Sequence, residues 1–584
     1  MTVAGANDTL VPGGKVLVIG LDGGTWSVLD RFMSLGCMPT LKSLCESGYR
    51  ADLMSTDPPL TPVAWSSFAT GMNPGKHGVF GFLDQRAEPG SYMPPPVSSR
   101  SLRAPTLWRR VSDAGLRATV LSVPLTYPPE PINGFMVTGM FTPESAGNST
   151  HPQSLAQELR RSGIMPKFSL DFTRRLDRGF RDAVVADALS GGAAGYFSDL
   201  NDVTERLRAA SLCLMERPWD LFVSVFISTD RLQHVMWDGV ESAEPNSERG
   251  SDIAGVYSRL DSAIADMVNA AGDDTTTLIV SDHGFGPCAG NFHMARWLVE
   301  AGYSAHGPRR AYGAAKNALG ALGIKHVAGR VVRGLGVGRA VRKNFIPLDW
   351  SRTRAYFQPG TYGVRVNLRG REPEGVVEPG AEFEALRKEL TERMTGMRDP
   401  SSGRRVVDIA LRAEDLYDGE QLRFAPDIVL RPDPEHGYHL VPGDPGADSL
   451  TSLDPKTRGS HRPTGIFLAR GPGVERGNAG RVDMTDVAPT IMRLLGLAGH
   501  DDLDGRVVKG IVADTLGGSG GAEAAAQFAG RDAAASDKAI SETSEADTST
   551  ASEAEPAVPD EGSDYSEAER DEIRRRLRNL GYVD

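Results

Sequence analysis

The stretch LTPVAWSSFATGMNPGKHG, residues 60 to 78, sets the interpretation of the rest of the chain. In it, Thr61 precedes Pro62, and proline is favoured at the first position of a helix because its φ suits a helix and its missing N–H would be unpaired there anyway. Apolar residues recur at helical spacing until glycine and proline end the pattern: Ala64, Trp65, Phe68, Ala69, Gly71 and Pro74. Thr61 is therefore expected where a helix begins.

A hydroxyl at a helix N-terminus has two interpretations. The free N–H groups and the positive end of the helix dipole favour an anion such as phosphate, and a deprotonated hydroxyl placed there can attack phosphorus. Alternatively, Thr61 only caps the helix, which is the commoner role of such a threonine. The rest of the chain has to distinguish the two.

Composition limits the function classes. The 584 residues are 40% hydrophobic and 24% charged, which indicates a soluble globular protein with one large domain and insertions. The net charge of −12 and the lack of a basic patch argue against a nucleic-acid partner. Four scattered cysteines suggest neither a disulfide framework nor a cysteine-ligated metal. Without a signal peptide or a long apolar run, we expect a cytoplasmic protein with no membrane span.

Three short apolar runs each lead to an aspartate. The runs are residues 15–21, 221–229 and 275–280, and the acids that follow are Asp22, Asp230 and Asp282. His234 comes one helical turn after Asp230, and His283 directly follows Asp282. Ligands of open α/β sheets bind beyond the carboxyl ends of parallel strands, so we expect these groups to converge. Taken singly, Asp22 could be a turn residue and the Asp230 and His234 pair could be solvated.

His461 supplies a third imidazole. It lies in the polar sequence RGSH just before another predicted strand, residues 465–469. A lone histidine in such a loop is more often plain surface. In this chain it would complete a set of three ligands with Asp230 and His234.

The combined set suits two divalent cations. Three carboxylates, three imidazoles and no thiolate favour zinc, with manganese or iron as alternatives. Two such ions bring four positive charges against three carboxylates and one threonine alkoxide, so the charge balances only when Thr61 is ionised. Ions ~3.5–4 Å apart could stabilise both the attacking and the leaving oxygen of a phosphate ester. A phosphothreonine intermediate would then be hydrolysed.

The ordered motifs resemble the type I phosphodiesterase/nucleotide pyrophosphatase branch of the alkaline phosphatase superfamily over roughly residues 14 to 510. This resemblance implies an α/β fold, an α/β/α sandwich around a largely parallel sheet. It also implies one ion held by Asp22, Thr61, Asp282 and His283, and a second held by Asp230, His234 and His461. The activity implied is metal-dependent hydrolysis of small phosphate esters, either mono- or diesters.

One feature departs from the nucleotide pyrophosphatases. Those relatives place an asparagine near the nucleophile, whereas residues 62–65 here offer no amide. The chain is therefore more similar to the bacterial predicted phosphohydrolase/phosphomutase group, which residues 349–377 also resemble.

The remaining sequence predicts the domain organisation. We expect a disordered N-terminus (1–13), a catalytic domain (14–516) with an inserted cap (289–455), a disordered acidic linker (517–563) and a C-terminal helix (564–584). A helix near residues 27–47 should break at Pro39, and residues 128–215 should be mostly helical. The C-terminal helix has a thin apolar stripe and is expected to dock on the body or on a partner.

Three other functions are alternatives to phosphate ester hydrolysis. A sulfatase needs a cysteine or serine in a different motif. A phosphomutase would return the phosphoryl group to another oxygen of the substrate. A phospho-ligand-binding scaffold would not need all seven site residues.

Overall fold

The computed structural model describes residues 14–86, 92, 94–168, 194–244, 247–307, 348–443, 445, 448–453, 458–498, 501–511 and 564–579. The predicted N-terminal tail (1–13) and the predicted acidic linker (517–563) lie outside the described residues.

A nine-stranded sheet forms the centre of the molecule, in the order β18-β2-β17-β7-β1-β6-β3-β4-β5. Its middle strands, from β7 to β4, run parallel to one another, whereas β17 and β5 run antiparallel to their neighbours. The fold is therefore the expected α/β class with a largely parallel sheet. The strands are β1 (Lys15–Leu21), β2 (Tyr49–Met54), β3 (Ala118–Leu121), β4 (Gly134–Val137), β5 (Thr150–His151), β6 (Leu221–Phe226), β7 (Thr275–Val280), β17 (Thr464–Arg470) and β18 (Gly477–Asp483).

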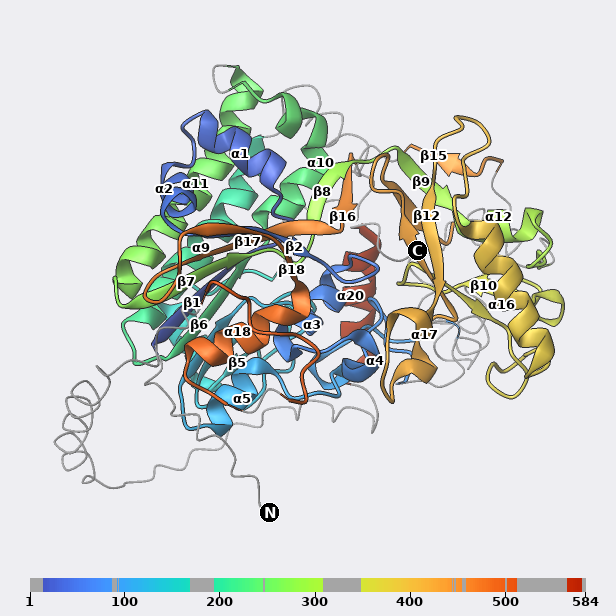
Figure 1. The fold of residues 1–584 in the computed structure, drawn as a ribbon, viewed down its shortest axis with the longest axis horizontal. Coiled ribbons are helices and arrows are strands. Elements are labelled where there is room, and N and C mark those ends of the chain that lie inside the picture. The colour runs from blue at the N-terminus through green and yellow to red at the C-terminus, as the bar shows by residue number, and fades with distance from the viewer. Residues whose placement is uncertain are drawn as a thin grey trace, which may run out of the picture.

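Helices cover both faces of this sheet, which gives three layers (Figure 1). Alternate residues of β1 point to opposite faces, so Leu17 and Ile19 join one core cluster while Val16 and Val18 join the other. A strand buried on both faces reads as a continuous apolar run, which is why β1 and β7 could be predicted to the residue. One face carries α1 (Trp26–Ser34), α2 (Pro39–Ser47), α9 (Ala194–Met215), α10 (Ser228–Ser242) and α11 (Glu248–Ala271), and the other carries α3 (Thr61–Thr70), α5 (Leu107–Asp113) and α18 (Val487–Leu494).

Local predictions were confirmed at some boundaries and wrong at others. The break at Pro39 is confirmed, because α2 begins there. The strand predicted to reach residue 229 ends at Phe226, and α10 begins at Ser228. The mostly helical prediction for residues 128–215 was wrong in part, since β4 and β5 precede α6 (Ser154–Arg161) and extend the sheet. These two strands are only four and two residues long, too short to show a period.

The chain between β7 and β17 builds a second group of strands and helices beside the central sheet, to the right in Figure 1. Its strands form a four-stranded sheet, β10-β11-β13-β12, and a three-stranded sheet, β14-β9-β15. The elements are β9 (Gly290–His293), α12 (Met294–Glu300), β10 (Ala355–Phe357), β11 (Gly363–Val366), α16 (Ala381–Met394), β12 (Val407–Arg412), α17 (Ala413–Leu416), β13 (Ile428–Pro432), β14 (Tyr438–Val441) and β15 (Thr451–Ser452).

The C-terminal helix α20 (Glu567–Asn579) packs on the rest of the chain. Its apolar residues Ile573 and Leu577 and the preceding Tyr565 are each at most 2% exposed and belong to the core cluster that also holds the second group of strands. The stripe is thus covered by this chain itself, and nothing in the described residues supports the predicted contact with a partner. Among the helices that the structure describes, none is both long and apolar enough to cross a membrane.

Candidate active site

Three neighbouring strands, β7, β1 and β6, deliver the three predicted carboxylates to one edge of the sheet. Asp22 follows β1, Asp282 lies two residues beyond the end of β7, and Asp230 lies in the first turn of α10, directly after β6. All three are at most 2% exposed. Because parallel strands end at the same edge, acids far apart in the chain come together.

Thr61 is the first residue of α3, as predicted, and it does not cap that helix. The N-cap residue is Leu60, and no side chain accepts a capping hydrogen bond there. The N–H groups of Val63 and Ala64 both donate to the Leu60 carbonyl, so they are not available to an anion as the sequence suggested. The Thr61 hydroxyl instead lies 3.3 Å from His283 Nε2.

His461 lies on a short strand, β16 (Gly459–Arg462), and not in a loop. This strand pairs antiparallel with β8 (Gly284–Pro287), which begins directly after His283, and the pairing sets His461 opposite Phe285. The prediction of a loop was wrong because a four-residue strand rich in polar residues has no apolar alternation. The interpretation of His461 as a surface residue is also excluded, since it is 7% exposed.

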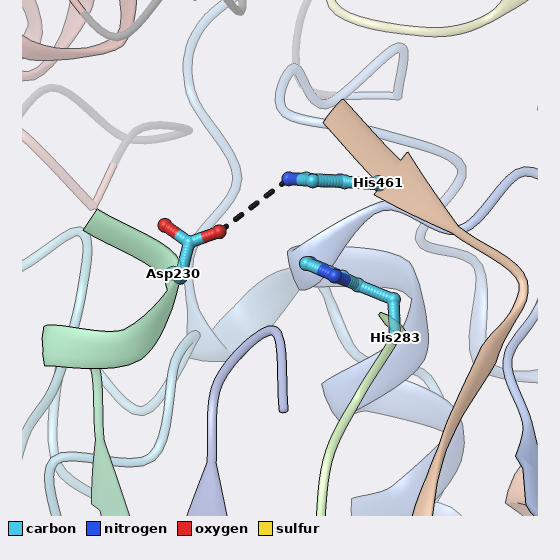
Figure 2. Close-up of side chains that lie close together, drawn as sticks. All are labelled: Asp230, His283 and His461. Atoms are coloured by element: carbon cyan, nitrogen blue, oxygen red, sulfur yellow. Dashed lines mark ion pairs between the residues drawn. The ribbon is translucent and has the colours of Figure 1, made fainter. Parts of the chain in front are cut away.

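One group of predicted ligands gathers around Asp230. Its Oδ1 atom lies 3.3 Å from His234 Nε2 and 3.5 Å from His461 Nε2. The two imidazole Nε2 atoms are 3.1 Å apart. Figure 2 shows the Asp230 carboxylate and the His461 ring pointing toward the same space, with His283 beside them. His234 lies one turn after Asp230 on α10, and both are buried, so they are not a solvated pair.

The second group of predicted ligands adjoins the first. His283 Nε2 lies 3.2 Å from Asp282 Oδ2 and 3.8 Å from Asp22 Oδ1, and ligand atoms of these three residues all fall within 4.8 Å of one another. The rings of His283 and His461 stack with centroids 3.6 Å apart. The structure therefore brings all seven predicted residues together.

The donor atoms fit divalent cations. The Nδ1 atoms of the three histidines lie within 3.1 Å of the backbone carbonyls of Gly459, Gly284 and Pro59. A carbonyl can only accept, so each Nδ1 donates its N–H to a carbonyl and Nε2 is the ring atom that faces the carboxylates, the arrangement typical of metal-bound histidines. Each carboxylate also has a buried oxygen that accepts no hydrogen bond from the described residues: Asp22 Oδ1, Asp230 Oδ1 and Asp282 Oδ2. Histidine nitrogens and carboxylate oxygens gathered at such distances are a donor set that suits divalent cations.

The electrostatics differ between the two groups. Burial, and next the Asp282 carboxylate, raise the pKa of Asp22 well above its usual value, and burial also raises the pKa of Asp282. Burial pushes Asp230 in the same direction, but His234, His461 and Arg231 outweigh it and hold the pKa of Asp230 well below its usual value. Burial lowers the pKa of His283 and of His461, which favours the neutral imidazole.

Some neighbours of the site were not predicted. Phe285 packs against the rings of His234, His283 and His461 with centroids 4.8–6.1 Å away. Arg231 is 8% exposed, and its Nη1 lies 3.6 Å from Asp230 Oδ2. Thr229 Oγ1 donates to the Asp22 carbonyl and fixes the turn after β1. These residues carry no spacing signal, because their roles depend on strand pairing that the sequence does not display.

Comparison with known proteins agrees with this geometry. The family model described as Type I phosphodiesterase / nucleotide pyrophosphatase matches residues 16–462. Among solved structures, a phosphonoacetate hydrolase from Sinorhizobium meliloti 1021 is 17% identical, with 83% of this chain and 96% of that chain covered and a TM-score of 0.51. Murine ectonucleotide pyrophosphatase/phosphodiesterase 5 is 13% identical over 83% of this chain and 96% of its own, with a TM-score of 0.44. No curated protein matches the chain in sequence.

Proposed function

The chain belongs to the type I phosphodiesterase/nucleotide pyrophosphatase family, and on that premise we propose that it hydrolyses small phosphate esters with two divalent cations and Thr61 as the nucleophile. Membership makes it a phosphoric ester hydrolase of the alkaline phosphatase superfamily. The metal dependence and the covalent intermediate are the proposal. The observation that carries it is the set of three buried carboxylates and three histidine Nε2 atoms that lie within 3.2–3.8 Å of one another beside the Thr61 hydroxyl.

In this proposal each residue has a stated role. One ion would be held by Asp22, Thr61, Asp282 and His283, and the other by Asp230, His234 and His461. When bound, the ions neutralise the phosphoryl oxygens and lower the pKa of the threonine hydroxyl; zinc suits the mixed nitrogen and oxygen donors, and manganese is the alternative.

The covalent step belongs to Thr61. Its Oγ1 bonds to phosphorus as the ester oxygen departs, and water then cleaves the phosphothreonine to release phosphate or a phosphate monoester. The Nδ1–H groups of the three histidines keep donating to backbone carbonyls throughout, which keeps the rings fixed in orientation. The dipole of α3 adds a favourable field at the transferred group.

Residues 289–455 are proposed to act as the cap that selects the ester. His439 on β14 is buried, and burial together with the neighbouring His234 and His461 lowers its pKa to about 3. Its ring makes an edge contact with Tyr362, centroids 5.9 Å apart. The influence of His234 and His461 on His439 indicates that β14 of this segment lies near the predicted ligands.

We also propose that the protein is located in the cytoplasm.

The test is a pair of substitutions at one atom. Thr61→Ala removes the nucleophile and should lower kcat on bis-p-nitrophenyl phosphate or p-nitrophenyl phosphate by about a thousandfold, ~4 kcal/mol of barrier, while the protein keeps its metals. Thr61→Ser keeps the hydroxyl and should stay within about tenfold of the parent. An alanine variant within about tenfold of the parent, only ~1.4 kcal/mol, would show that Thr61 is not the nucleophile.

A further inference from the structure

The C-terminal helix α20 forms hydrogen bonds with a loop that leads to the predicted site. The helix begins at a reciprocal cap, in which the Ser566 N–H donates to Glu569 Oε2 and the Glu569 N–H donates back to Ser566 Oγ. An isolated helix of 13 residues is only marginally stable in water, so its order depends on the surface it contacts. That surface is provided by this chain, and Figure 1 shows α20 between the central sheet and the second group of strands.

Contacts from α20 fall on consecutive backbone groups of residues 141–144, the loop that follows β4. The Tyr565 hydroxyl donates to the Val97 carbonyl at 2.9 Å and lies 3.3 Å from the carbonyl of Phe141, 424 residues away in sequence. Arg576 donates to the Thr142 carbonyl, and Glu572 accepts from the N–H of Glu144. Hydrogen bonds from Tyr565 and α20 thus reach the backbone at three of these four residues.

This loop is conformationally costly. Phe141 has a φ of 79°, and Leu125 and Ser122 on the loop after β3 have φ values of 65° and 56°. They are the non-glycine residues with positive φ in the described part of the chain. Such a conformation is unfavourable for a residue with a Cβ and persists only where the surroundings hold it. Tyr565 contacts both loops. Its hydroxyl lies beside the Phe141 carbonyl, and its ring stacks on Tyr127, with centroids 5.6 Å apart.

The other side of the same loop touches the site. Met140 Sδ accepts from Arg231 Nη2 at 3.8 Å, and Arg231 Nη1 lies 3.6 Å from Asp230 Oδ2. Leu60, which precedes the Thr61 nucleophile of the proposed function, belongs to the same core cluster as Met140, Phe141 and Tyr565. Residues 140–141 therefore lie between α20 and the residues flanking the proposed metal ligands.

We infer that α20 is a positioning element for the site: by holding residues 141–144, it fixes Met140 against Arg231 and so keeps Asp230 in the geometry that binds a cation. The inference rests on the proposed metal site, with Asp230 as a ligand. It assigns a catalytic consequence to a segment that contributes no residue to the ligand set.

The test compares two aspartate substitutions on one helix. Ile573→Asp introduces a charge on the buried face, where Ile573 is 1% exposed, and should undock α20. Arg575→Asp introduces the same residue on the exposed face and is the matched control. Metal affinity of the full-length chelated protein, titrated with Zn²⁺ by calorimetry, should weaken about tenfold for one of the two ions in Ile573→Asp and stay unchanged in Arg575→Asp.

A peptide separates positioning from general loss of fold. Ile573→Asp should keep a cooperative thermal transition, and a synthetic peptide of residues 564–579 added in excess should restore its Zn²⁺ affinity and its turnover of bis-p-nitrophenyl phosphate. Tyr565→Phe, which removes only the hydroxyl, should show a smaller loss in the same direction. Parent-like affinity in Ile573→Asp, with limited proteolysis showing α20 released, overturns the inference, and so does a loss that the peptide does not restore. A parent that binds two ions but turns over no ester would contradict the proposed function alone, because the affinity readout does not depend on turnover.

Discussion

At the scale of single residues, the site depends on which nitrogen of each histidine faces the carboxylates as well as on the distances between the side chains. Each of the three histidines donates its Nδ1–H to a backbone carbonyl, and its Nε2 therefore faces the carboxylates of Asp22, Asp230 and Asp282. Sequence spacing alone predicted the seven side chains but not the carbonyl partners, because those come from Pro59, Gly284 and Gly459, whose backbone positions depend on tertiary structure.

Removing one ligand should remove one ion. Asp230→Asn replaces a carboxylate whose Oδ1 faces His234 and His461, and the neutral amide cannot balance the charge of a cation there. Elemental analysis of the purified protein should show about one divalent ion per chain instead of two. Asp238→Asn, an exposed position on the same helix, is the control and should retain both. Two ions retained in Asp230→Asn would remove Asp230 from the ligand set.

The pH dependence of the metal-free protein should follow Asp22 and Asp282. Their pKa values are raised in the folded state. Above the ordinary aspartate pKa of about 3.8, the folded protein therefore keeps protons on these two groups that the unfolded chain has already released. These two groups therefore lower the free energy of unfolding when the pH is above their folded-state pKa values. The loss becomes smaller as the pH falls through those pKa values. Asp230, with its lowered pKa, acts oppositely and loses its contribution only below about 3.8.

In thermal unfolding with a chelator present, Tm should accordingly rise as the pH is lowered from neutral through the raised pKa values. Asp22→Asn should flatten this rise and increase Tm at neutral pH, because the like-charge repulsion is gone. Tm that falls steadily with acidification over the same range would mean that the carboxylates are not crowded as described.

At the scale of elements, β1 and α3 fix Thr61 relative to the acids. Gly20 on β1 allows the indole of Trp65 on α3 to lie directly over the strand, since a Cβ at Gly20 would come 2.6 Å from Trp65 Cη2 and 2.7 Å from Val225 Cγ2. The helical pattern of residues 61–70 and the apolar run of residues 15–21 both predicted their elements well. What they could not show is this contact, which sets the distance between Thr61 and Asp22.

Gly20→Ala should therefore destabilise the protein by about 1–3 kcal/mol, the usual cost of overpacking a core, and should also reduce activity. Chemical denaturation measures the first effect and ester hydrolysis the second. Gly14→Ala, directly before the same strand and with nothing within 4 Å of the added Cβ, should be close to neutral in both. Equal effects from the two substitutions would argue against a tight β1–α3 contact.

At the scale of the whole molecule, sequence and structure agree where periodicity is strong and differ where it is short. The buried strands β1 and β7 and the broken helix at Pro39 followed from apolar runs and proline chemistry. The strand β16 that carries His461 and the edge strands β4 and β5 did not, because two to four residues cannot express a period and are held by their partners. The hydrogen bonds between the C-terminal segment and the loop at residues 141–144 could not be predicted either, because they join residues far apart in the sequence.

The most direct test of the central claim is an anomalous difference map from crystals grown with Zn²⁺ or Mn²⁺. The proposal predicts two peaks, one among Asp22, Asp282 and His283 and one among Asp230, His234 and His461, with Thr61 beside the first. A third candidate group, Asp433, Glu435 and His436, already has Asp433 engaged by Arg405 and should stay empty. A single peak, or density only at Asp433, would contradict a two-ion site at the carboxyl ends of β1, β6 and β7.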